Sequence, residues 1–446
     1  MNLRSTDSLS VEALQSKGSS FKNTEVGRVP TDWEVVCLRE VANFGGGTTP
    51  PRKNFEKFYA SGTHPWVKTL DLNNGYISST EENVTEAAFS ETSLKMHPIG
   101  TVLVAMYGGF NQIGRTGLIK VSAAINQALV AVITKKERLV PTYLLYYLNY
   151  KVDYWKTVAS SSRKDPNITS NDVKNFILPL PSEIEQTAIA NALSDVDALI
   201  QELEKLIAKK QAIKTATMQQ LLTGRTRLPQ FAHHPDGRKK GYKPSELGEI
   251  PEDWEVEPFS KLAKPDNARV NPKVDGGGDF CIELEHISSG TGSLLGSTET
   301  NENSSLKSIF APGDVLFGKL RSYLRKYWLA EFSGVCSTEI WVLKPEKNKA
   351  ISGFIFYLVQ RDEFIEAASE AYGTHMPRSD WKVVSMFPVA TPSTEEQVAI
   401  TSILSDIDAE IQAFEKRLSK TRQIKQGMMQ ELLTGKTRLV KPAGAA

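Results

Sequence analysis

Apolar residues recur at alternating steps of four and three in two long stretches of the chain, 182–224 and 393–435. This spacing places them on one helix face and is typical of the seam of a coiled coil. It predicts two helices of about 40 residues each. The predicted seam positions are Ile189, Leu193, Val196, Ile200, Leu203 and Ile207 in the first stretch, and Ile400, Leu404, Ile407, Ile411, Phe414 and Leu418 in the second.

Both predicted helices carry start and stop signals. The segments Ser182-Glu183-Ile184-Glu185 and Ser393-Thr394-Glu395-Glu396 each follow a proline and have the pattern of a capping box. In a capping box the serine side chain caps an early N–H and the glutamate reaches back to the cap. Gly224 and Gly435 stand where the apolar pattern ends, and we predict that they are C′ residues.

The two helical stretches are copies of each other. Residues 185–228 and 396–439, at an offset of 211, are identical at 25 of 44 positions. Residues 21–42 and 242–263, at an offset of 221, are identical at 9 of 22 positions. Similar faces related by a pseudo-two-fold axis predict that the two helices pair antiparallel. The alternative is two amphipathic helices, each packed only on its own domain.

The stretches between the repeats share little direct identity. Strands are predicted at 66–68, 100–107 and 129–134 in the first stretch, with a helix at 143–149, and at 279–284, 314–317 and 339–343 in the second, with a helix at 353–360. The predicted fold class is α+β, with two mixed α/β domains joined by two long helices that form an antiparallel coiled coil.

The repeat also predicts the domain boundaries. They are 1–20 for a flexible N-terminal segment, 21–181 for the first domain, 182–224 for the first helical region, 225–241 for a basic linker, 242–392 for the second domain, 393–435 for the second helical region and 436–446 for a C-terminal tail.

Composition narrows the class of protein. Lys and Arg number 53 against 52 Asp and Glu, so a basic surface, if present, must be local. No apolar run is long enough to predict a membrane span, the N-terminus lacks a secretory signal, and three widely spaced cysteines favour a cytoplasmic protein without disulfides or zinc. The stretch 225–243 contains six basic residues and only one acidic residue, Asp236. That stretch is either a solvated connector or a contact with the DNA backbone.

Loops rich in glycine, aromatic and basic residues are the candidate binding surface. Arg, Lys, Asn and Gln side chains reach phosphates and base edges, and glycines let the backbone approach closely. In the first domain the predicted DNA-binding residues are Arg52, Lys53, Lys68, Tyr107, Asn111, Gln112, Arg115, Arg163 and Lys164; in the second they are Lys319, Arg321, Tyr323, Arg325, Lys326, His375 and Arg378. The alternative for each basic residue is an ordinary solvated charge.

Enzyme motifs are missing from the sequence. The segment 313–320 nearly fits a phosphate-binding P-loop, but Leu320 stands where Ser or Thr should hold Mg²⁺. Neither HExxH, GxSxG nor CxxC occurs, and the histidines show no ligand spacing. We therefore predict a binding protein with no catalytic residues, no metal site and no cofactor of its own.

The doubled motifs resemble the specificity subunit of type I restriction–modification systems. Pro-x-Asp-Trp occurs at 30–33 and 251–254, Glu-Gln-x-Ala-Ile at 185–189 and 396–400, and Leu-Leu-Thr-Gly-Arg/Lys-Thr-Arg-Leu ends both helical regions. The resemblance implies two target-recognition domains at the ends of an antiparallel coiled coil, each reading one half of a bipartite site in double-stranded DNA.

The resemblance also implies partner subunits. It implies two methyltransferase subunits that bind S-adenosylmethionine and methylate adenine, and restriction subunits that use ATP and Mg²⁺ to translocate and cut DNA. Two other readings stay open at this point. One is a scaffold that joins two protein-binding domains, and the other is an enzyme with an unfamiliar site.

Overall fold

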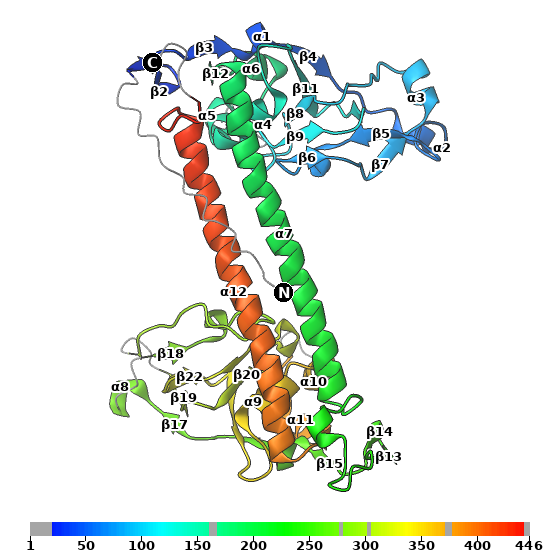
Figure 1. Ribbon diagram of the computed structural model, residues 1–446, viewed down its shortest axis with the longest axis vertical. Coiled ribbons are helices and arrows are strands. Elements are labelled where there is room, and N and C mark those ends of the chain that lie inside the picture. Colours follow the sequence, from blue (N-terminus) through cyan, green and yellow to red (C-terminus); the bar gives the residue numbers. More distant parts are fainter. Residues whose placement is uncertain (1–19, 160–166, 276–279, 301–304, 371–376, 441–446) are drawn as a thin grey trace. The chain divides into compact units, whose positions relative to one another are not determined.

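The computed structural model describes residues 20–159, 167–275, 280–300, 305–370 and 377–440. The chain forms two compact units. The first unit comprises Met1–Leu203 together with Arg417–Ala446, and the second comprises Glu204–Lys416. Each unit therefore contains one variable stretch and one end of each long helix (Figure 1).

The two long helices are α7 (Glu183–Leu221) and α12 (Thr394–Leu432), each of 39 residues. They confirm the two helices predicted from the heptad spacing. In the second unit Lys214 pairs with Asp408, and Lys210 pairs with Glu410. Residue numbers rise on one helix as they fall on the other, so the helices are antiparallel there.

The first unit is built on two sheets. The larger has the strand order β4-β11-β8-β9-β6, antiparallel except for the parallel β6–β9 pair. The smaller has the order β10-β5-β7. The hairpin β1–β2 and the pair β3–β12 stand apart from both sheets, and β3–β12 joins the start of the domain to its end.

The strands of this unit are β1 (Phe21–Thr24), β2 (Gly27–Pro30), β3 (Glu34–Cys37), β4 (Ala42–Gly46), β5 (His64–Val67), β6 (Tyr76–Ile77), β7 (Glu82–Val84), β8 (Val102–Ala105), β9 (Thr116–Ile119), β10 (Ala124–Ile125), β11 (Leu129–Thr134) and β12 (Ile177–Leu180). Its short helices are α1 (Leu38–Val41), α2 (Phe55–Phe58), α3 (Glu86–Glu91), α4 (Pro141–Tyr150), α5 (Tyr154–Val158) and α6 (Ser170–Lys174).

The second unit repeats this plan with different sheets. It has a hairpin, β13–β14, and a pair that joins start to end, β15–β24. Its two four-stranded sheets have the orders β16-β23-β20-β21 and β17-β19-β22-β18. The hairpin β20–β21 lies beside β23, as β8–β9 lies beside β11 in the first unit.

The strands of the second unit are β13 (Tyr242–Ser245), β14 (Gly248–Pro251), β15 (Glu255–Pro258), β16 (Ala263–Pro265), β17 (Arg269–Val270), β18 (Cys281–Ile282), β19 (Lys307–Phe310), β20 (Val315–Gly318), β21 (Tyr327–Leu329), β22 (Gly334–Ser337), β23 (Ile340–Pro345) and β24 (Pro388–Thr391). Its short helices are α8 (Pro272–Asp275), α9 (Ser352–Leu358), α10 (Asp362–Ser369) and α11 (Trp381–Val384).

One buried helix forms the centre of the core in each unit. Residues 143–148 of α4 are buried without interruption, and so are residues 354–358 of α9. A helix that is apolar on all sides must be covered on all sides. In the first unit α4 shares a core with β8, β9 and the start of α7, and in the second α9 shares one with β20, β23 and the start of α12.

The predicted strands and short helices were found close to their expected places. The strand at 129–134 and the helix at 143–149 are confirmed, the latter as part of α4. The strand expected at 100–107 is shorter, because Gly100 has a φ of +88° and the extended strand begins at Val102. The strand expected at 279–284 is wrong beyond Cys281–Ile282, because a 3₁₀ turn begins at Leu284; position 279 lies outside the described residues.

Candidate nucleic-acid interface

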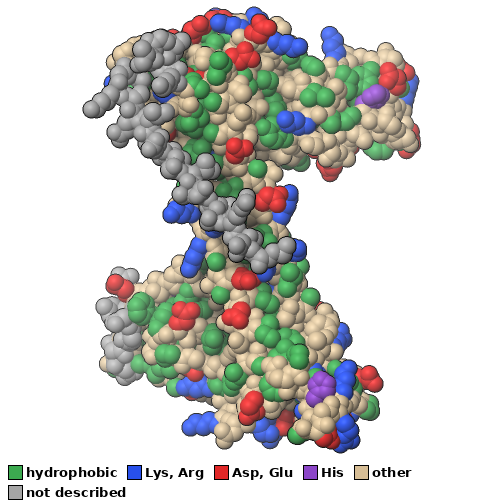
Figure 2. Space-filling view, viewed as in Figure 1, with side chains coloured by type: hydrophobic (Ala, Val, Ile, Leu, Met, Phe, Trp, Pro, Cys, Tyr) green, Lys and Arg blue, Asp and Glu red, His purple; other side chains and the backbone are tan. Residues whose placement is uncertain are grey.

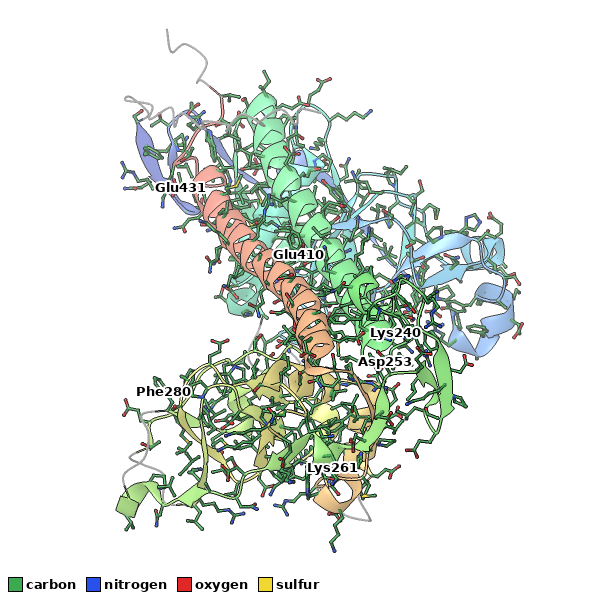
Figure 3. The ribbon with its side chains drawn as sticks, turned by 60° about the horizontal axis from the view of Figure 1, so that its bottom comes forward. Lys240, Asp253, Lys261, Phe280, Glu410 and Glu431 are labelled. Carbon is green, nitrogen blue, oxygen red and sulfur yellow. The ribbon has the colours of Figure 1, made fainter. Side chains whose placement is uncertain are left out.

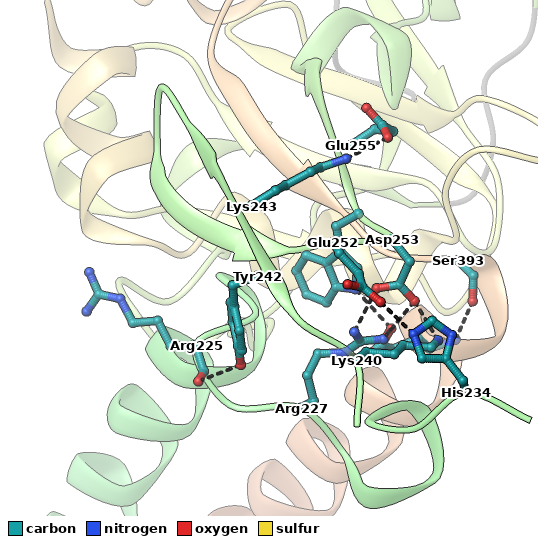
Figure 4. A network of polar contacts seen from close by, with 12 residues as sticks. Arg225, Arg227, His234, Lys240, Tyr242, Lys243, Glu252, Asp253, Glu255 and Ser393 are labelled. Atoms are coloured by element: carbon teal, nitrogen blue, oxygen red, sulfur yellow. Dashed lines mark hydrogen bonds and ion pairs between the residues drawn. The ribbon is translucent and has the colours of Figure 1, made fainter. Parts of the chain in front are cut away.

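A buried arginine ties the end of α7 to the start of α12 in the second unit. Arg227 lies 2.7 Å from a carboxylate oxygen of Glu396 and 2.7 Å from one of Asp253. Figure 4 shows Arg227 beside Asp253. The indole N–H of Trp254 donates to the same Glu396 carboxylate at 3.0 Å. Burial opposes the positive charge, but hydrogen bonds to Glu396 and Asp253 outweigh it and raise the pKa of Arg227.

The first unit contains the same arrangement. Arg438 pairs with Glu185 and lies 2.8 Å from an oxygen of Asp32, while the indole of Trp33 donates to Glu185 at 3.1 Å. Hydrogen bonding from Arg438 lowers the pKa of Asp32. We call these two clusters the arginine anchors: Arg438, Asp32, Trp33 and Glu185 in the first unit, and Arg227, Asp253, Trp254 and Glu396 in the second.

In each of the two predicted capping boxes, the serine contact is present and the glutamate contact is not. The serine half is correct, because the backbone N–H groups of Glu185 and Glu396 donate to Ser182 and Ser393, each at 3.3 Å. The glutamate half is wrong. Both glutamates are buried, and their carboxylates bind the anchor arginine and tryptophan instead. A buried carboxylate needs a full positive partner, and the arginine supplies one.

One glycine after each long helix lets the chain pack closely against the arginine anchor of that unit. Gly224 and Gly435 have φ values of +70° and +69°, which confirms the predicted stops after the long helices. A Cβ on Gly224 would lie 2.5 Å from Pro251, and a Cβ on Gly435 would lie 2.5 Å from Pro30. The repeated Leu-Thr-Gly and Pro-x-Asp-Trp motifs are therefore two sides of one contact.

A second repeated cluster fixes the domain core to the helices. In the first unit Tyr146 of α4 donates to Asp197 of α7 at 2.8 Å, and Lys425 of α12 lies 2.6 Å from Asp197. We call this the first tyrosine lock.

The second tyrosine lock has the same geometry with the roles of the helices exchanged. Tyr357 of α9 donates to Asp408 of α12 at 2.9 Å, and Lys214 of α7 lies 2.7 Å from Asp408. Burial raises the pKa of Tyr357, as it does that of Tyr146, so both remain hydrogen-bond donors. The sequence reasoning missed both locks, although their members all repeat at the offset of 211.

Several basic residues of the stretch 225–243 form ion pairs with acids of the same unit. Lys240 lies 2.6 Å from Asp253, Lys243 lies 2.8 Å from Glu255 and Arg238 lies 2.8 Å from Asp236. Figure 3 shows Lys240 beside Asp253. These pairs favour the reading of this stretch as a connector, because its charges are largely met within the chain.

The first-domain candidates fall into two groups. Arg52 and Lys68 lie at the end of the unit formed by α2, β5 and β7, away from α5 (Figure 1). Both bind Glu82, at 2.6 Å and 2.9 Å, and Arg52 also stacks over Tyr59. Hydrogen bonding from Arg52 lowers the pKa of Glu82 to about 2. Lys53 is exposed beside them.

The second group lies on the loop between β8 and β9, residues 106–115. Tyr107 and Asn111 are exposed, and Arg115 donates to the side chain of Gln112 at 2.9 Å. The backbone N–H of Ile168 donates to Met106 at 3.0 Å, so the chain returns to the base of this loop. The candidates Arg163 and Lys164 lie outside the described residues.

The second-domain candidates are brought together on the loop between β20 and β21. Arg321 and Tyr323 are exposed, whereas Arg325 pairs with Asp362 and Lys326 donates to the carbonyl of Ile287. The loop is joined to the segment that carries Arg378, because the backbone N–H of Ser379 donates to the carbonyl of Lys319 at 2.8 Å. Arg378 itself pairs with Glu339 at 2.9 Å. His375 lies outside the described residues.

The face of the molecule drawn in Figure 2 carries basic and acidic side chains side by side. In Figure 2 the Lys and Arg side chains are scattered over each unit and mixed with acids. Among the basic candidates in the described ranges, five have no acidic partner: Lys53, Arg115, Lys319, Arg321 and Lys326. Arg115 and Lys326 donate instead to Gln112 and to the carbonyl of Ile287, so Lys53, Lys319 and Arg321 are the charges most available to a phosphate.

The predicted seam positions differ in burial. Ile189 and Leu193 belong to the core of the first unit, and Ile400 and Leu404 belong to that of the second. Further along, Leu203, Ile207 and Ile411 are buried, while Val196, Ile200, Ile407, Phe414 and Leu418 are partly buried. The first positions of each stretch thus pack on a domain, and the pairing of the later positions across the helices stays a prediction.

Over the described residues, the side chains of His, Cys, Asp and Glu form no group of three or more that could hold a metal ion. No helix in the described part of the chain has the length and apolar character that crossing a membrane requires.

The fold and the two arginine anchors define a scaffold with two unlike domains mounted on duplicated ends. The chain belongs to the family described as the type I restriction modification DNA specificity domain, which matches residues 30–215 and 276–424. It is 26% identical to the putative type I restriction enzyme MjaX specificity subunit of Methanocaldococcus jannaschii, over 95% of this chain and 98% of that protein. It is 25% identical to the EcoDI specificity subunit of Escherichia coli, over 88% and 85% of the two chains.

A solved structure supports the same fold. The S subunit of the type I restriction–modification system of M. genitalium matches with a TM-score of 0.55 at 14% identity, over 90% of this chain and 96% of that one. The chain is accordingly a type I restriction–modification specificity subunit, which is a non-catalytic component of such a system.

Proposed function

We propose that this subunit is the sequence reader of its complex. Each domain reads one half of an asymmetric bipartite site in double-stranded DNA, and the two long helices set the distance between the halves. Partner subunits then methylate adenine in that site or restrict DNA that lacks the methyl group. The proposed domains are residues 21–181 and 242–392, and the proposed helical regions are 182–224 and 393–435.

One observation carries the proposal. The residues that fix each domain to the helices are duplicated, whereas the loops that each domain presents are not. The arginine anchors and tyrosine locks match position by position, but the loop 106–115 shares no pattern with 319–326. Two equivalent mounts with unlike surfaces suit a reader of two unlike half-sites, because dimeric readers match their own symmetry to that of their site.

The proposed partners are those that the resemblance to type I specificity subunits implies. We propose that two methyltransferase subunits supply S-adenosylmethionine chemistry, and that restriction subunits supply ATP- and Mg²⁺-dependent translocation and cleavage. A near-neutral subunit suits this arrangement, because basic partners can share the phosphate contacts. The net charge of this chain is +1.

Gel shifts and methylome sequencing test the proposal together. The chain is purified with its methyltransferase subunits and mixed with a random DNA pool, and the genome of a host that expresses the complex is scanned for methylated adenine. We expect selection of two short motifs at a fixed separation and the same motif in the methylome. Selection of no sequence, or of a single continuous motif, would contradict the proposal. A scaffold for two protein-binding domains would select none.

A domain exchange sharpens the test. Replacing residues 43–181 by the equivalent stretch of another such subunit should change the first half-site and leave the second unchanged. The exchanged stretch contains Tyr146 of the first tyrosine lock, so the donor should carry a tyrosine there. A matched exchange with phenylalanine at that position is the control. A stable chimera that still methylates the original site would rule out a reader in residues 43–181.

A longer helix pair tests the spacing. Adding seven residues to both α7 and α12 keeps the heptad in phase and adds about 10 Å to each helix. At about 3.4 Å per base pair the spacer should grow by up to about three base pairs, with lower affinity because the half-site also rotates around the DNA. Seven residues in α7 alone should break the pairing. An active doubly extended variant with an unchanged spacer would show that the helices do not set the distance.

A further inference from the structure

The loops at equivalent places in the two domains each expose two large apolar side chains. In the first unit they are Tyr107 and Phe110, with 41% and 49% of their surface exposed. In the second unit they are Tyr323 and Leu324, at 53% and 39%. Each pair lies on the connection of an antiparallel hairpin, β8–β9 in one unit and β20–β21 in the other.

The second-unit loop holds its apolar pair on a rigid mount. Arg321 and Arg325, on either side of the pair, both have a φ of +53°, which is unfavourable for residues that carry a side chain. Ser322 is buried and donates to the carbonyl of Ala368 at 2.9 Å. The hydrogen bond of Ser322 therefore fixes the strained turn to the domain, and Tyr323 and Leu324 remain exposed on it.

In the first unit, glycines and a tryptophan hold the loop that exposes Tyr107 and Phe110. Gly108 and Gly109 have φ values of +113° and +76°, which places the chain in the region that glycine tolerates. Gly114 closes the loop against Trp155, where a Cβ would lie 2.1 Å from the indole ring. Tyr107 and Phe110 stand on a loop whose base is fixed.

From this placement we propose that both apolar pairs are wedges that enter DNA between bases and unstack a base step within each half-site. The inference rests on the proposed function. Apolar side chains inserted between base steps kink a duplex, and the energy of deformation depends on the sequence that is deformed. The wedges then supply sequence discrimination that hydrogen bonds to base edges do not.

Charge and sequence both favour DNA over a protein as the occupant. Lys319 and Arg321 lie just before the second wedge in the same loop and have no acidic partner in the described part of the chain. A partner subunit present in two copies would contact residues that repeat, as the arginine anchors and tyrosine locks do. The wedges do not repeat in sequence.

Three variants distinguish a wedge from an ordinary surface contact with DNA. For each, binding is measured with the chain in complex with its methyltransferase subunits, on a duplex that carries the sequence found in the methylome. Tyr323→Ala should weaken specific binding by about 5- to 150-fold, the range for loss of one base–aromatic stack. Its salt slope should not change, because an apolar side chain releases no counterions. Tyr323→Phe should bind as the wild type does. Lys319→Ala, which removes a charge without an acidic partner in the described residues, should instead reduce the salt slope by about 1 and weaken binding to all sequences alike.

The unstacking itself is measured with 2-aminopurine placed in the second half-site, away from the methylated adenine. Its fluorescence should rise when the wild-type complex binds and should not rise with Tyr323→Ala. The Tyr107→Ala variant should abolish the equivalent signal in the first half-site only. The exposed position of Tyr323 means that its loss should leave the unfolding temperature unchanged.

The outcomes are distinguishable. Wild-type binding to the bipartite duplex without a 2-aminopurine signal would overturn the wedge and leave the proposed function standing. Equal losses in Tyr323→Phe and Tyr323→Ala would also overturn it, because the hydroxyl would then be reading a base edge. A wild-type complex that selects no bipartite duplex would overturn both.

Discussion

The two units hold their domains with the same residues but present different ones. In each, an arginine after the helix end meets an aspartate, a tryptophan and a glutamate, and a tyrosine from the buried helix meets an aspartate–lysine pair. Between those mounts the first unit has sheets of five and three strands and the second has two of four. The contrast teaches that the residues that fix each domain to the helices and the residues that each domain exposes are under separate constraints.

The units also differ in how the loop is tied to the long helices. In the second, Gln360 accepts from Lys214 at 3.0 Å, and Arg325 pairs with Asp362 two residues further on. In the first, the equivalent position is Asn149, which accepts from Thr116 on β9 at 2.5 Å. The second loop is therefore connected through side chains to a lysine of the tyrosine lock, whereas the first is connected to its own sheet.

The largest expected effect is loss of an anchor arginine. Arg438→Ala and Arg227→Ala should each cost about 3–5 kcal/mol, because a buried glutamate is left without its partner. Arg438→Ala should cost more, since Asp253 keeps Lys240 when Arg227 is removed. Hydrogen exchange of amides in each unit measures the loss separately, because a chain of two units need not unfold in a single step.

Matched controls for the two anchor arginines are the basic residues two positions before them in the sequence. Arg225 and Lys436 are exposed, so their alanine variants should stay within about 0.5 kcal/mol of the wild type. An equal loss in Arg225→Ala and Arg227→Ala would show that the second arginine anchor contributes no more than a surface charge.

The next effect compares two arginines of the loop 319–326. Arg321→Ala should cost about 1–3 kcal/mol of specific binding and relax one position of the proposed second half-site. Arg325→Ala should cost less, because that side chain is already engaged with Asp362. Binding to single-base variants of the site measures both. The alanine variant of all four basic residues, 319, 321, 325 and 326, would contradict a DNA-facing loop if it methylated its site normally.

The tyrosine locks should give a somewhat smaller effect. Asp197→Asn and Asp408→Asn each remove a charge-assisted pair that is partly exposed, so we expect about 1–2 kcal/mol in the affected unit. Asp197→Asn should cost more, because Lys214 retains Gln360 when Asp408 is neutralised.

The exposed neighbours Asp195 and Asp406 provide controls for the locks on the same helices. Their asparagine variants should leave both units as stable as the wild type in denaturant unfolding. If Asp195→Asn weakened the first unit as much as Asp197→Asn, general helix charge rather than the lock would be responsible.

The smallest effect is confined to the first unit and depends on pH. The folded pKa of Glu82 is about 2 against an ordinary value of 4.5, so its pair with Arg52 stabilises the unit fully above pH 4.5. The contribution is lost as the pH falls toward 2. Because Arg52 is about half exposed, we expect only about 1 kcal/mol from Glu82→Gln at pH 7. Thermal unfolding at pH 7 and pH 2 should show the difference at pH 7 alone.

The long helices and their stops were predictable because they depend on local spacing. A heptad pattern and a glycine after it describe neighbours on the same helix, and both α7 and α12 follow. The anchor role of Glu185 was not predictable by the same logic, because its partner Arg438 lies 253 residues away. The sequence Ser-x-x-Glu is the same whether the glutamate caps the helix or is buried against an arginine, so the sequence alone does not distinguish the two.

The candidate site was predictable only as a choice of residue types. Composition selected Arg52 and Arg378, but their pairing with Glu82 and Glu339 depends on strands that meet in the folded unit. A stronger signal was present in the repeat. The tyrosine, aspartate and lysine of each lock recur at one offset, and a shared offset across a divergent stretch marks residues held by the same contact.

The position of Arg438 has a consequence for synthesis of the chain. The first unit needs Arg438 to neutralise Glu185, yet Asp32 and Trp33 leave the ribosome some 400 residues earlier. The second unit is continuous in sequence, from Glu204 to Lys416, and can close while translation is still under way. Domains generally fold in the order of their synthesis. Here we expect the reverse order, because the first unit is completed only after Arg438 has been synthesised.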